Sequence, residues 1–149
     1  MRFAIGGVIR KSSESIQCHH GIAASPAQQS KGTIEVGPTL FGDGGQTRDF
    51  TYVEDVAALV AKALTVPKSA CGKVFNAGNG NRYSLTETWE MLQKIEGVSI
   101  PPNYGPPREG DVRDSQADTT AARAELGHDP QFTFEEGLRQ TLAWYRTNR

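Results

Sequence analysis

Features that mark several common classes of protein are scarce in this sequence of 149 residues. Two cysteines are too few to build a disulfide framework, which fits a reducing, cytoplasmic setting. No apolar run approaches the roughly 18 residues that a membrane-spanning helix needs. The net charge of −1 leaves no basic excess to attract nucleic acid or an anionic membrane surface. We therefore expect a cytoplasmic protein whose partners include neither nucleic acid nor a membrane.

The first 37 residues carry little pattern that predicts regular structure. Residues 3–9 are compatible with one strand, but residues 11–37 are rich in Ser, Gln, Ala and Gly without a sustained period. We predict an irregular segment over residues 1–37. The whole chain of 149 residues is long enough for a single domain with one hydrophobic core.

Three adjacent residues of types that bind metals lie within that segment: Cys18, His19 and His20. A closed zinc site needs about four ligands. The other candidates, Cys71 and His128, are far away in the sequence. We therefore predict a loop without a metal rather than a metal site.

Residues 38–56, PTLFGDGGQTRDFTYVEDV, organise the rest of the sequence. Their glycines permit a tight turn or a close approach of the backbone to a ligand. The aromatic and β-branched residues 50–53 predict a strand, and Asp55 opens an apolar pattern with helical spacing. Arg48 lies between turn and strand, where a guanidinium could bind a phosphate in bidentate fashion. A structural ion pair between Arg48 and Asp49 is the alternative.

Local signals also predict the elements that follow. Ser84 with Glu87, and Thr133 with Glu136, have capping-box spacing and each precedes an amphipathic helix. A proline-rich stretch at 101–107 predicts an extended, irregular backbone. The other expected elements are a strand at 73–77, a turn at 78–81, a short strand at 98–100 and a helix at 117–126 that ends at Gly127.

Four stretches carry a resemblance to a known family: FGDGGQTRDFTYVEDV, FNAGNGNRYSLTE, PPREGDV and SQADTTAARAELGHDPQFTFEEGLRQTLAWYR. They resemble the extended short-chain dehydrogenase/reductases, in the NAD-dependent epimerase/dehydratase branch, and are most similar to the C-terminal part of UDP-glucose/UDP-galactose 4-epimerases. The resemblance covers residues 38–147. It implies an α/β fold: the C-terminal, substrate-binding part of a Rossmann-type epimerase, with short strands, about four helices and no cofactor-binding half.

The resemblance also implies a set of residues that bind a UDP-sugar. They are Thr39 and Phe41 at the uracil, Arg48 and Arg108 at the diphosphate, Phe50 and Tyr83 along the nucleotide pocket, and Asp111 at a ribose hydroxyl. Two arginines at a diphosphate suit charge-assisted, bidentate hydrogen bonds. The chain from 38 to 149 is therefore expected to be a UDP-sugar-binding domain.

Two motifs that the full family uses for catalysis are missing from the sequence. No Gly-x-x-Gly-x-x-Gly is present, although this motif would cradle the phosphates of NAD. No Tyr-x-x-x-Lys is present either; in the family that Tyr is the general base. We assign no catalytic residue, expect NAD to serve the full-length family but not to bind this chain alone, and expect no epimerase turnover from it.

Three functions remain as hypotheses. The first is the UDP-sugar-binding part of an NAD-dependent 4-epimerase, and the second is a truncated binding or interaction module that forms a homodimer or joins a separate cofactor domain. The third is a non-functional remnant that still folds, with gene truncation or a frame change as the origin of residues 1–37. Apolar surface left exposed by the helices would favour dimerisation or aggregation.

Overall fold

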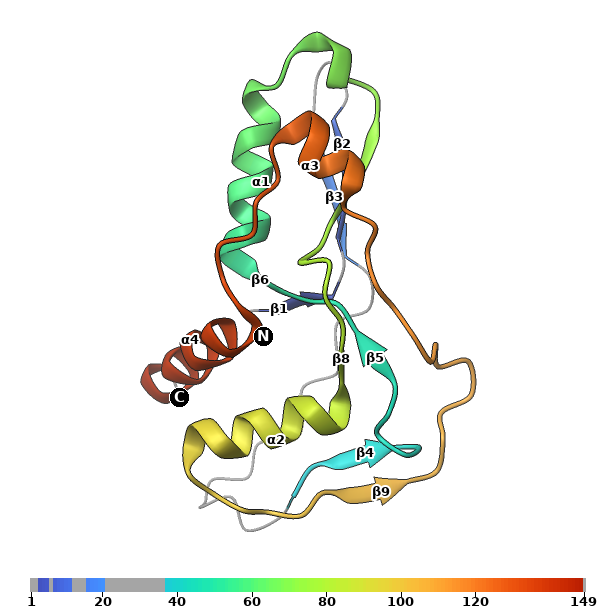
Figure 1. Cartoon of the computed structure of the whole chain (residues 1–149), viewed down its shortest axis with the longest axis vertical. Helices are drawn as coiled ribbons and strands as arrows, with labels where there is room; N and C mark the ends of the chain where they lie inside the picture. Colours follow the sequence, from blue (N-terminus) through green and yellow to red (C-terminus); the bar gives the residue numbers. More distant parts are fainter. Residues whose placement is uncertain (1–2, 6, 12–15, 21–36, 149) are drawn as a thin grey trace. The chain divides into compact units, whose positions relative to one another are not determined.

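A computed structural model describes residues 3–5, 7–11 and 16–20 as backbone, and residues 37–148 in full. The fold is mixed α/β, with short strands and four α-helices among the described residues (Figure 1). The chain divides into two compact units. Unit 1 comprises residues 1–23, 49–82 and 116–149, and unit 2 comprises residues 24–48 and 83–115.

Unit 1 contains a three-stranded antiparallel sheet of order β3-β2-β7 and an antiparallel pair of β1 with β6. Its strands are β1 (Phe3–Ile5), β2 (Gly7–Lys11), β3 (Ile16–His20), β6 (Phe50–Tyr52) and β7 (Val74–Ala77). Its helices are α1 (Val53–Thr65), a 3-10 helix (Lys68–Ala70), α3 (Thr120–Leu126) and α4 (Phe134–Thr147).

The hydrophobic core of unit 1 lies between β7 and the two helices α1 and α3, which run side by side in Figure 1. Residues of β7 alternate, so Phe75 and Ala77 are buried while Val74 is exposed. Leu59 of α1 and Leu126 of α3 complete this core. Burying each Leu or Phe side chain stabilises the fold by about 1.5–3 kcal/mol.

A buried carboxylate holds three segments of unit 1 together. The side chain of Asp49 is 1% exposed and accepts hydrogen bonds from the backbone N–H groups of Asn79 (3.0 Å), Gly80 (3.0 Å) and Ala117 (3.2 Å). The hydroxyl of Thr51 donates a further bond to it (3.2 Å). Asp49 therefore joins the start of β6 to the turn after β7 and to the segment before α3.

A second buried carboxylate, Asp55 in the first turn of α1, fixes the entry to α4. Its Oδ1 accepts from the backbone N–H of Gln131 at 2.7 Å. Phe50 and Phe134 stack with ring centroids 5.2 Å apart, which attaches β6 to the same helix. Thr133 begins α4 with the capping box that the sequence predicts.

Unit 2 contains two small strand pairs and one helix. The parallel pair consists of β4 (Thr39–Phe41) and β9 (Asn103–Gly105), and the antiparallel pair of β5 (Thr47–Arg48) and β8 (Tyr83–Ser84). Helix α2 (Leu85–Glu96) begins with the predicted capping box of Ser84 and Glu87 and ends at Gly97, which adopts a left-handed conformation with φ 68°. The N–H groups of Leu85 and Thr86 donate to the carbonyls of Gln46 and Gly44, so the start of α2 is fixed to the turn after β4.

Three expectations are wrong. Residues 16–20, expected to be irregular, form β3, and residues 7–11 form β2, a strand separate from β1. Strand β2 pairs with β3 on one side and with β7 on the other, and such long-range pairing leaves no local period in the sequence. No strand forms at 98–100; instead β9 lies between prolines within 101–107 and pairs in parallel with β4 at the edge of a two-stranded sheet. Trp89 of α2 is half-buried, and its indole N–H donates to the carbonyl of Ile100 at 2.9 Å.

Candidate functional site

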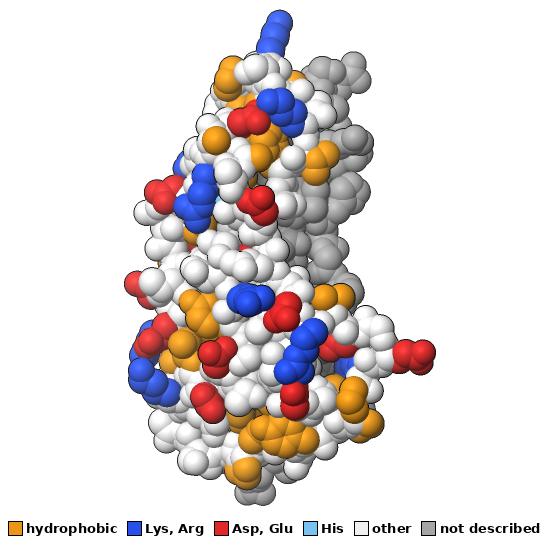
Figure 2. Space-filling view, turned by 45° about the vertical axis from the view of Figure 1, so that its right-hand side comes forward, with side chains coloured by type: hydrophobic (Ala, Val, Ile, Leu, Met, Phe, Trp, Pro, Cys, Tyr) orange, Lys and Arg blue, Asp and Glu red, His pale blue; other side chains and the backbone are white. Residues whose placement is uncertain are grey.

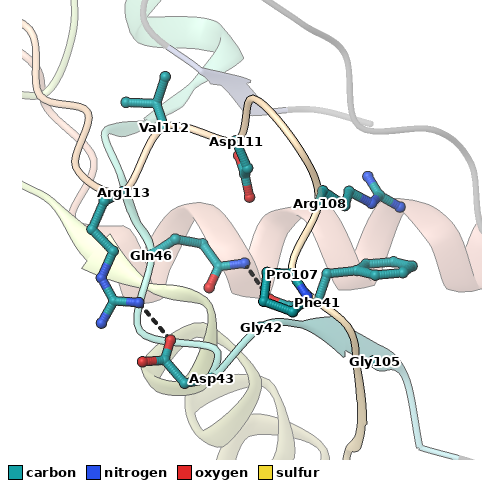
Figure 3. A pocket seen from close by; sticks show the side chains of 10 residues that line it. All are labelled: Phe41, Gly42, Asp43, Gln46, Gly105, Pro107, Arg108, Asp111, Val112 and Arg113. Carbon is teal, nitrogen blue, oxygen red and sulfur yellow. Dashed lines mark hydrogen bonds and ion pairs between the residues drawn. The ribbon is translucent and has the colours of Figure 1, made fainter.

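A cavity of about 480 Å³ lies in unit 2, between the turn after β4 and the loop after β9 (Figure 3). Its lining residues are Phe41, Gly42, Asp43, Gln46, Gly105, Pro107, Arg108, Asp111, Val112 and Arg113. The two segments are far apart in the sequence, since residues 41–46 supply one wall and residues 105–113 the other. The parallel pairing of β4 with β9 brings them together.

Hydrogen bonds and two left-handed glycines shape the turn that forms one wall. Gly42 and Gly44 have φ values of 75° and 72°, conformations that other residues rarely adopt. The N–H of Gly42 donates to the carbonyl of Gly105 at 3.0 Å, across to the second wall. The amide of Gln46, a buried side chain, donates to the carbonyl of Phe41 at 2.8 Å. The turn is therefore closed on itself and bound to the opposite loop.

Arg48 binds two residues of the second wall. Its Nη1 donates to the carbonyls of Thr47 and Val112, both at 2.7 Å, and its Nη2 forms an ion pair with Asp111. The side chain is only 15% exposed. Among the described ion pairs, Arg48 is joined to Asp111. The sequence left open an ion pair with Asp49 instead, but the Asp49 carboxylate accepts hydrogen bonds from backbone amides of unit 1.

Arg108 lies on the loop and packs over an aromatic ring of the turn. Its guanidinium carbon is 3.8 Å from the centroid of the Phe41 ring, which is a cation–π contact. Figure 3 shows the two side chains lying along each other at one end of the cavity. The contact presents a guanidinium and an aromatic face within the same site.

A second ion pair, between Asp43 and Arg113, closes the other end of the cavity. Arg113 Nη1 is 2.6 Å from Asp43 Oδ1, and that oxygen also accepts from the N–H of Gly45 at 2.9 Å. The bond from Arg113 is the main cause that lowers the pKa of Asp43 to about 2, and Asp43 in turn raises the pKa of Arg113. The sequence analysis did not identify Asp43 or Arg113 as site residues. The opposite charges of the GDGG turn and the GDVRD loop were the signal that could have indicated their ion pair.

The structure brings some of the expected ligand residues together and leaves others apart. Phe41, Arg108 and Asp111 line the cavity, and Arg48 is bonded to Asp111. Two more lie in unit 2 outside the lining: Thr39 is exposed on β4, and Tyr83 is half-buried on β8, paired with Arg48. Phe50 belongs to unit 1, where it is buried and stacked on Phe134.

Charged side chains and metal-ligating residues show no further site in the described part of the chain (Figure 2). On the face shown in Figure 2, basic and acidic side chains are interspersed rather than gathered by sign. No group of three or more His, Cys, Asp or Glu among the described residues could hold a metal ion. The side chains of Cys18, His19 and His20 lie outside this description. None of the described helices combines the length and apolarity that crossing a membrane requires.

Comparisons with known proteins identify relatives that share this part of the fold. The family model described as GDP-mannose 4,6 dehydratase matches residues 20–141, so the match begins earlier than the resemblance at residue 38. UDP-glucose 4-epimerase of Mycolicibacterium smegmatis is 36% identical over 107 residues, which are 72% of this chain and 34% of that protein.

Solved structures of 4-epimerases are similar to the same share of this chain. UDP-glucose 4-epimerase of Thermotoga maritima, determined with UDP-glucose, has a TM-score of 0.69 at 36% identity and covers 74% of this chain. UDP-glucuronic acid 4-epimerase of Bacillus cereus, in complex with UDP-glucuronic acid and NAD, has a TM-score of 0.71 at 33% identity and covers 75%. The chain spans about a third of the length of these relatives: 35% and 36% of the two solved chains. It belongs to the NAD-dependent epimerase/dehydratase family that the GDP-mannose 4,6 dehydratase model represents.

Proposed function

We propose that the cavity of unit 2 binds the nucleotide diphosphate of a UDP-sugar, and that the chain is the UDP-sugar-binding part of a 4-epimerase-like protein. The proposal covers binding; no catalytic residue is assigned to the chain. Two relatives were solved with UDP-glucose and with UDP-glucuronic acid, which favours this class of ligand over others.

The position of Arg108 and Asp111 at one cavity, with Arg48 bonded to Asp111 outside its lining, carries the proposal. Arg108 and Asp111 line it, and Arg48 reaches the same loop through Asp111. Two guanidinium groups can neutralise a diphosphate and donate several charge-assisted hydrogen bonds to it. The ring of Phe41, already in contact with Arg108, offers an apolar surface for the nucleotide.

Binding through Arg48 requires an exchange of partners. Both hydrogen-bonded Nη1 contacts of Arg48 go to backbone carbonyls, and Nη2 is paired with Asp111. A phosphate oxygen would replace Asp111 at this guanidinium, and the released carboxylate could then accept from a ribose hydroxyl, as the family resemblance implies for Asp111. Arg108 makes the more direct contact, because its described partner is a ring rather than a carboxylate.

We propose that the residues the structure describes in unit 2 do not form a site for NAD. The glycines of the turn after β4 would be the nearest candidates for a phosphate cradle in unit 2. The N–H groups of two of these glycines are already bonded, however, since Gly42 donates to Gly105 and Gly45 donates to Asp43. We propose that this chain alone does not bind NAD and does not turn over a UDP-sugar.

Titration calorimetry with UDP tests the proposal on the complete chain. Arg108→Ala should weaken binding by about ten- to a hundredfold, the range expected when one charge-assisted hydrogen-bond donor is lost. Arg139→Ala is the matched control, because Arg139 is an exposed arginine of α4 paired with Glu135, in unit 1. Equal UDP affinity in both variants would contradict the proposal.

The alternative is a binding or interaction module without an epimerase role, or a remnant that folds and binds nothing. Exposed large apolar side chains favour an interaction role: among them are Val74 (51% exposed), Tyr104 (58%) and Val112 (60%). The module would still bind UDP, whereas the remnant would not, so the same titration separates these two.

A further inference from the structure

We infer that the ion pair between Asp43 and Arg113 is a latch that keeps segment 106–112 of the cavity's second wall in the conformation that binds the ligand. Both members would then be positioning residues, which act through Arg108 and Asp111. This inference rests on the proposed binding of a nucleotide diphosphate for its affinity readout, but its effect on the loop can be measured without any ligand.

The attachments of the loop define where a latch would act. Every residue of segment 106–112 is exposed. At the β9 end, the carbonyl of Gly105 accepts from Gly42, and at the other end the carbonyl of Arg113 accepts from the N–H of Thr47 at 2.8 Å. Within it, the N–H of Asp111 donates to the carbonyl of Arg108 at 3.3 Å. Arg48 also binds this loop, at the carbonyl of Val112 and at Asp111, and Arg108 contacts Phe41. The loop that presents Arg108 therefore has few bonds within itself and depends on contacts with other segments.

The Asp43–Arg113 pair adds a side-chain bond from this loop to the opposite wall. Asp43 lies in the glycine turn, and Arg113 directly follows the loop, so their 2.6 Å contact spans the end of the cavity (Figure 3). The absence of a side chain at Gly45 makes the contact possible. A Cβ there would lie 2.7 Å from Arg113 Nη2 and 3.2 Å from Asp43 Oδ1, so it would push the guanidinium out of its place.

Preorganisation explains why such a pair would matter to binding. A loop that is already fixed in its bound conformation loses less conformational entropy when the ligand arrives. Asp43 and Arg113 are both 63% exposed, so the pair itself contributes little to global stability. Its effect would be local, on the order of a two- to fivefold change in affinity.

Electrostatics alone makes a different prediction, and this difference is what the experiment uses. Asp43 and Arg113 both line the cavity. If they acted only through their charges on an anionic ligand, removing Asp43 would strengthen binding and removing Arg113 would weaken it. A latch predicts weaker binding in both cases. Asp43→Asn suits the test because the remaining side-chain oxygen can still accept from Gly45, so the turn is preserved.

The experiment measures UDP affinity and backbone amide hydrogen exchange of segment 106–112 in the complete chain. Asp43→Asn and Arg113→Gln should each weaken UDP binding about two- to fivefold and speed exchange in the segment by a similar factor. Arg113→Lys, which keeps the cation, should lie closer to the unmodified chain than Arg113→Gln. Glu135→Gln, which breaks an exposed ion pair of α4, is the control and should change neither quantity.

Two results would overturn the latch: unchanged exchange of segment 106–112 in both Asp43→Asn and Arg113→Gln, or UDP binding by Asp43→Asn that equals or exceeds that of the unmodified chain. If the unmodified chain does not bind UDP, the proposed function fails. In that case the exchange measurement alone decides whether the latch exists.

Discussion

At the scale of single residues, the buried carboxylate of Asp49 requires several hydrogen-bond donors from other segments. It is 1% exposed, and three backbone N–H groups from two separate segments donate to it. A buried carboxylate is tolerated only when its lone pairs are satisfied in this way. In the sequence, Asp49 is simply the neighbour of Arg48, and its role was invisible because its partners lie about 30 and 68 residues away.

Asp49→Asn should therefore destabilise unit 1 by about 1–3 kcal/mol, because an amide NH₂ would face N–H groups that now donate to oxygen. The expected result is a lower unfolding midpoint in urea, followed by circular dichroism. Asp129→Asn makes the same change of charge at an exposed residue and should leave the midpoint nearly unchanged. Equal midpoints for the two variants would show that the bonds to Asp49 do not stabilise the fold.

Asp43 gives a prediction for pH dependence. Its pKa is lowered to about 2 from the ordinary 3.8, chiefly by the bond from Arg113. Because the pKa is depressed in the folded chain, the ion pair contributes above pH ~4 and is lost as the pH falls through about 2. Carboxyl carbon NMR should show Asp43 still ionised near pH 3 in the unmodified chain. In Arg113→Gln the midpoint should rise toward 3.8; an unmoved midpoint would mean that Arg113 does not bond to Asp43 in solution.

At the scale of elements, local signals predicted the helices well. Both capping boxes are present, and the Gly97 and Gly127 helix ends adopt left-handed conformations, because these features depend only on residues within one turn. The pairing of the strands was harder to predict from the sequence. The pairing of β4 with β9 joins residues 39–41 to residues 103–105, and nothing local in either segment indicates the other.

Ser84→Ala tests the capping box that attaches α2 to the site. The hydroxyl of Ser84 accepts from the N–H of Glu87 at 3.1 Å, and the backbone N–H of Ser84 donates to the Glu87 carboxylate at 2.7 Å, which lowers the pKa of Glu87. Loss of the cap should cost about 1 kcal/mol and speed amide exchange in the first turn of α2. Ser69→Ala, at an exposed serine of the 3-10 helix, serves as the control. Unchanged exchange in the first turn would contradict the assigned cap.

At the scale of the whole molecule, motif order predicted the family, while the structure was needed to locate the cavity. Phe41, Arg108 and Asp111 were expected at one site and do line one cavity. The Asp43–Arg113 pair and the bond from Arg48 to Asp111 could not be predicted, because each joins side chains more than 60 residues apart. Phe50, an aromatic residue within the motif, is packed on Phe134 in unit 1; its expected contact with a ligand stays a prediction.

Exposed apolar side chains give a prediction about association. Val74 lies on the outward-facing side of β7 and is 51% exposed. We predict that the chain self-associates as its concentration rises, which light scattering would detect as an increase in mean mass. Val74→Thr keeps the shape but adds a hydroxyl, and should reduce the association if this strand takes part. A constant monomer mass across the concentration range would contradict the prediction.

The central claim is that the cavity of unit 2 binds a nucleotide through its diphosphate. The most direct measurement is calorimetric titration of the unmodified chain with UDP and, in the same buffer, with uridine. We predict that UDP binds at least tenfold more tightly, because only UDP offers the phosphate oxygens that Arg48 and Arg108 would bind. Equal affinity for the two ligands, or no binding of UDP, would contradict the claim.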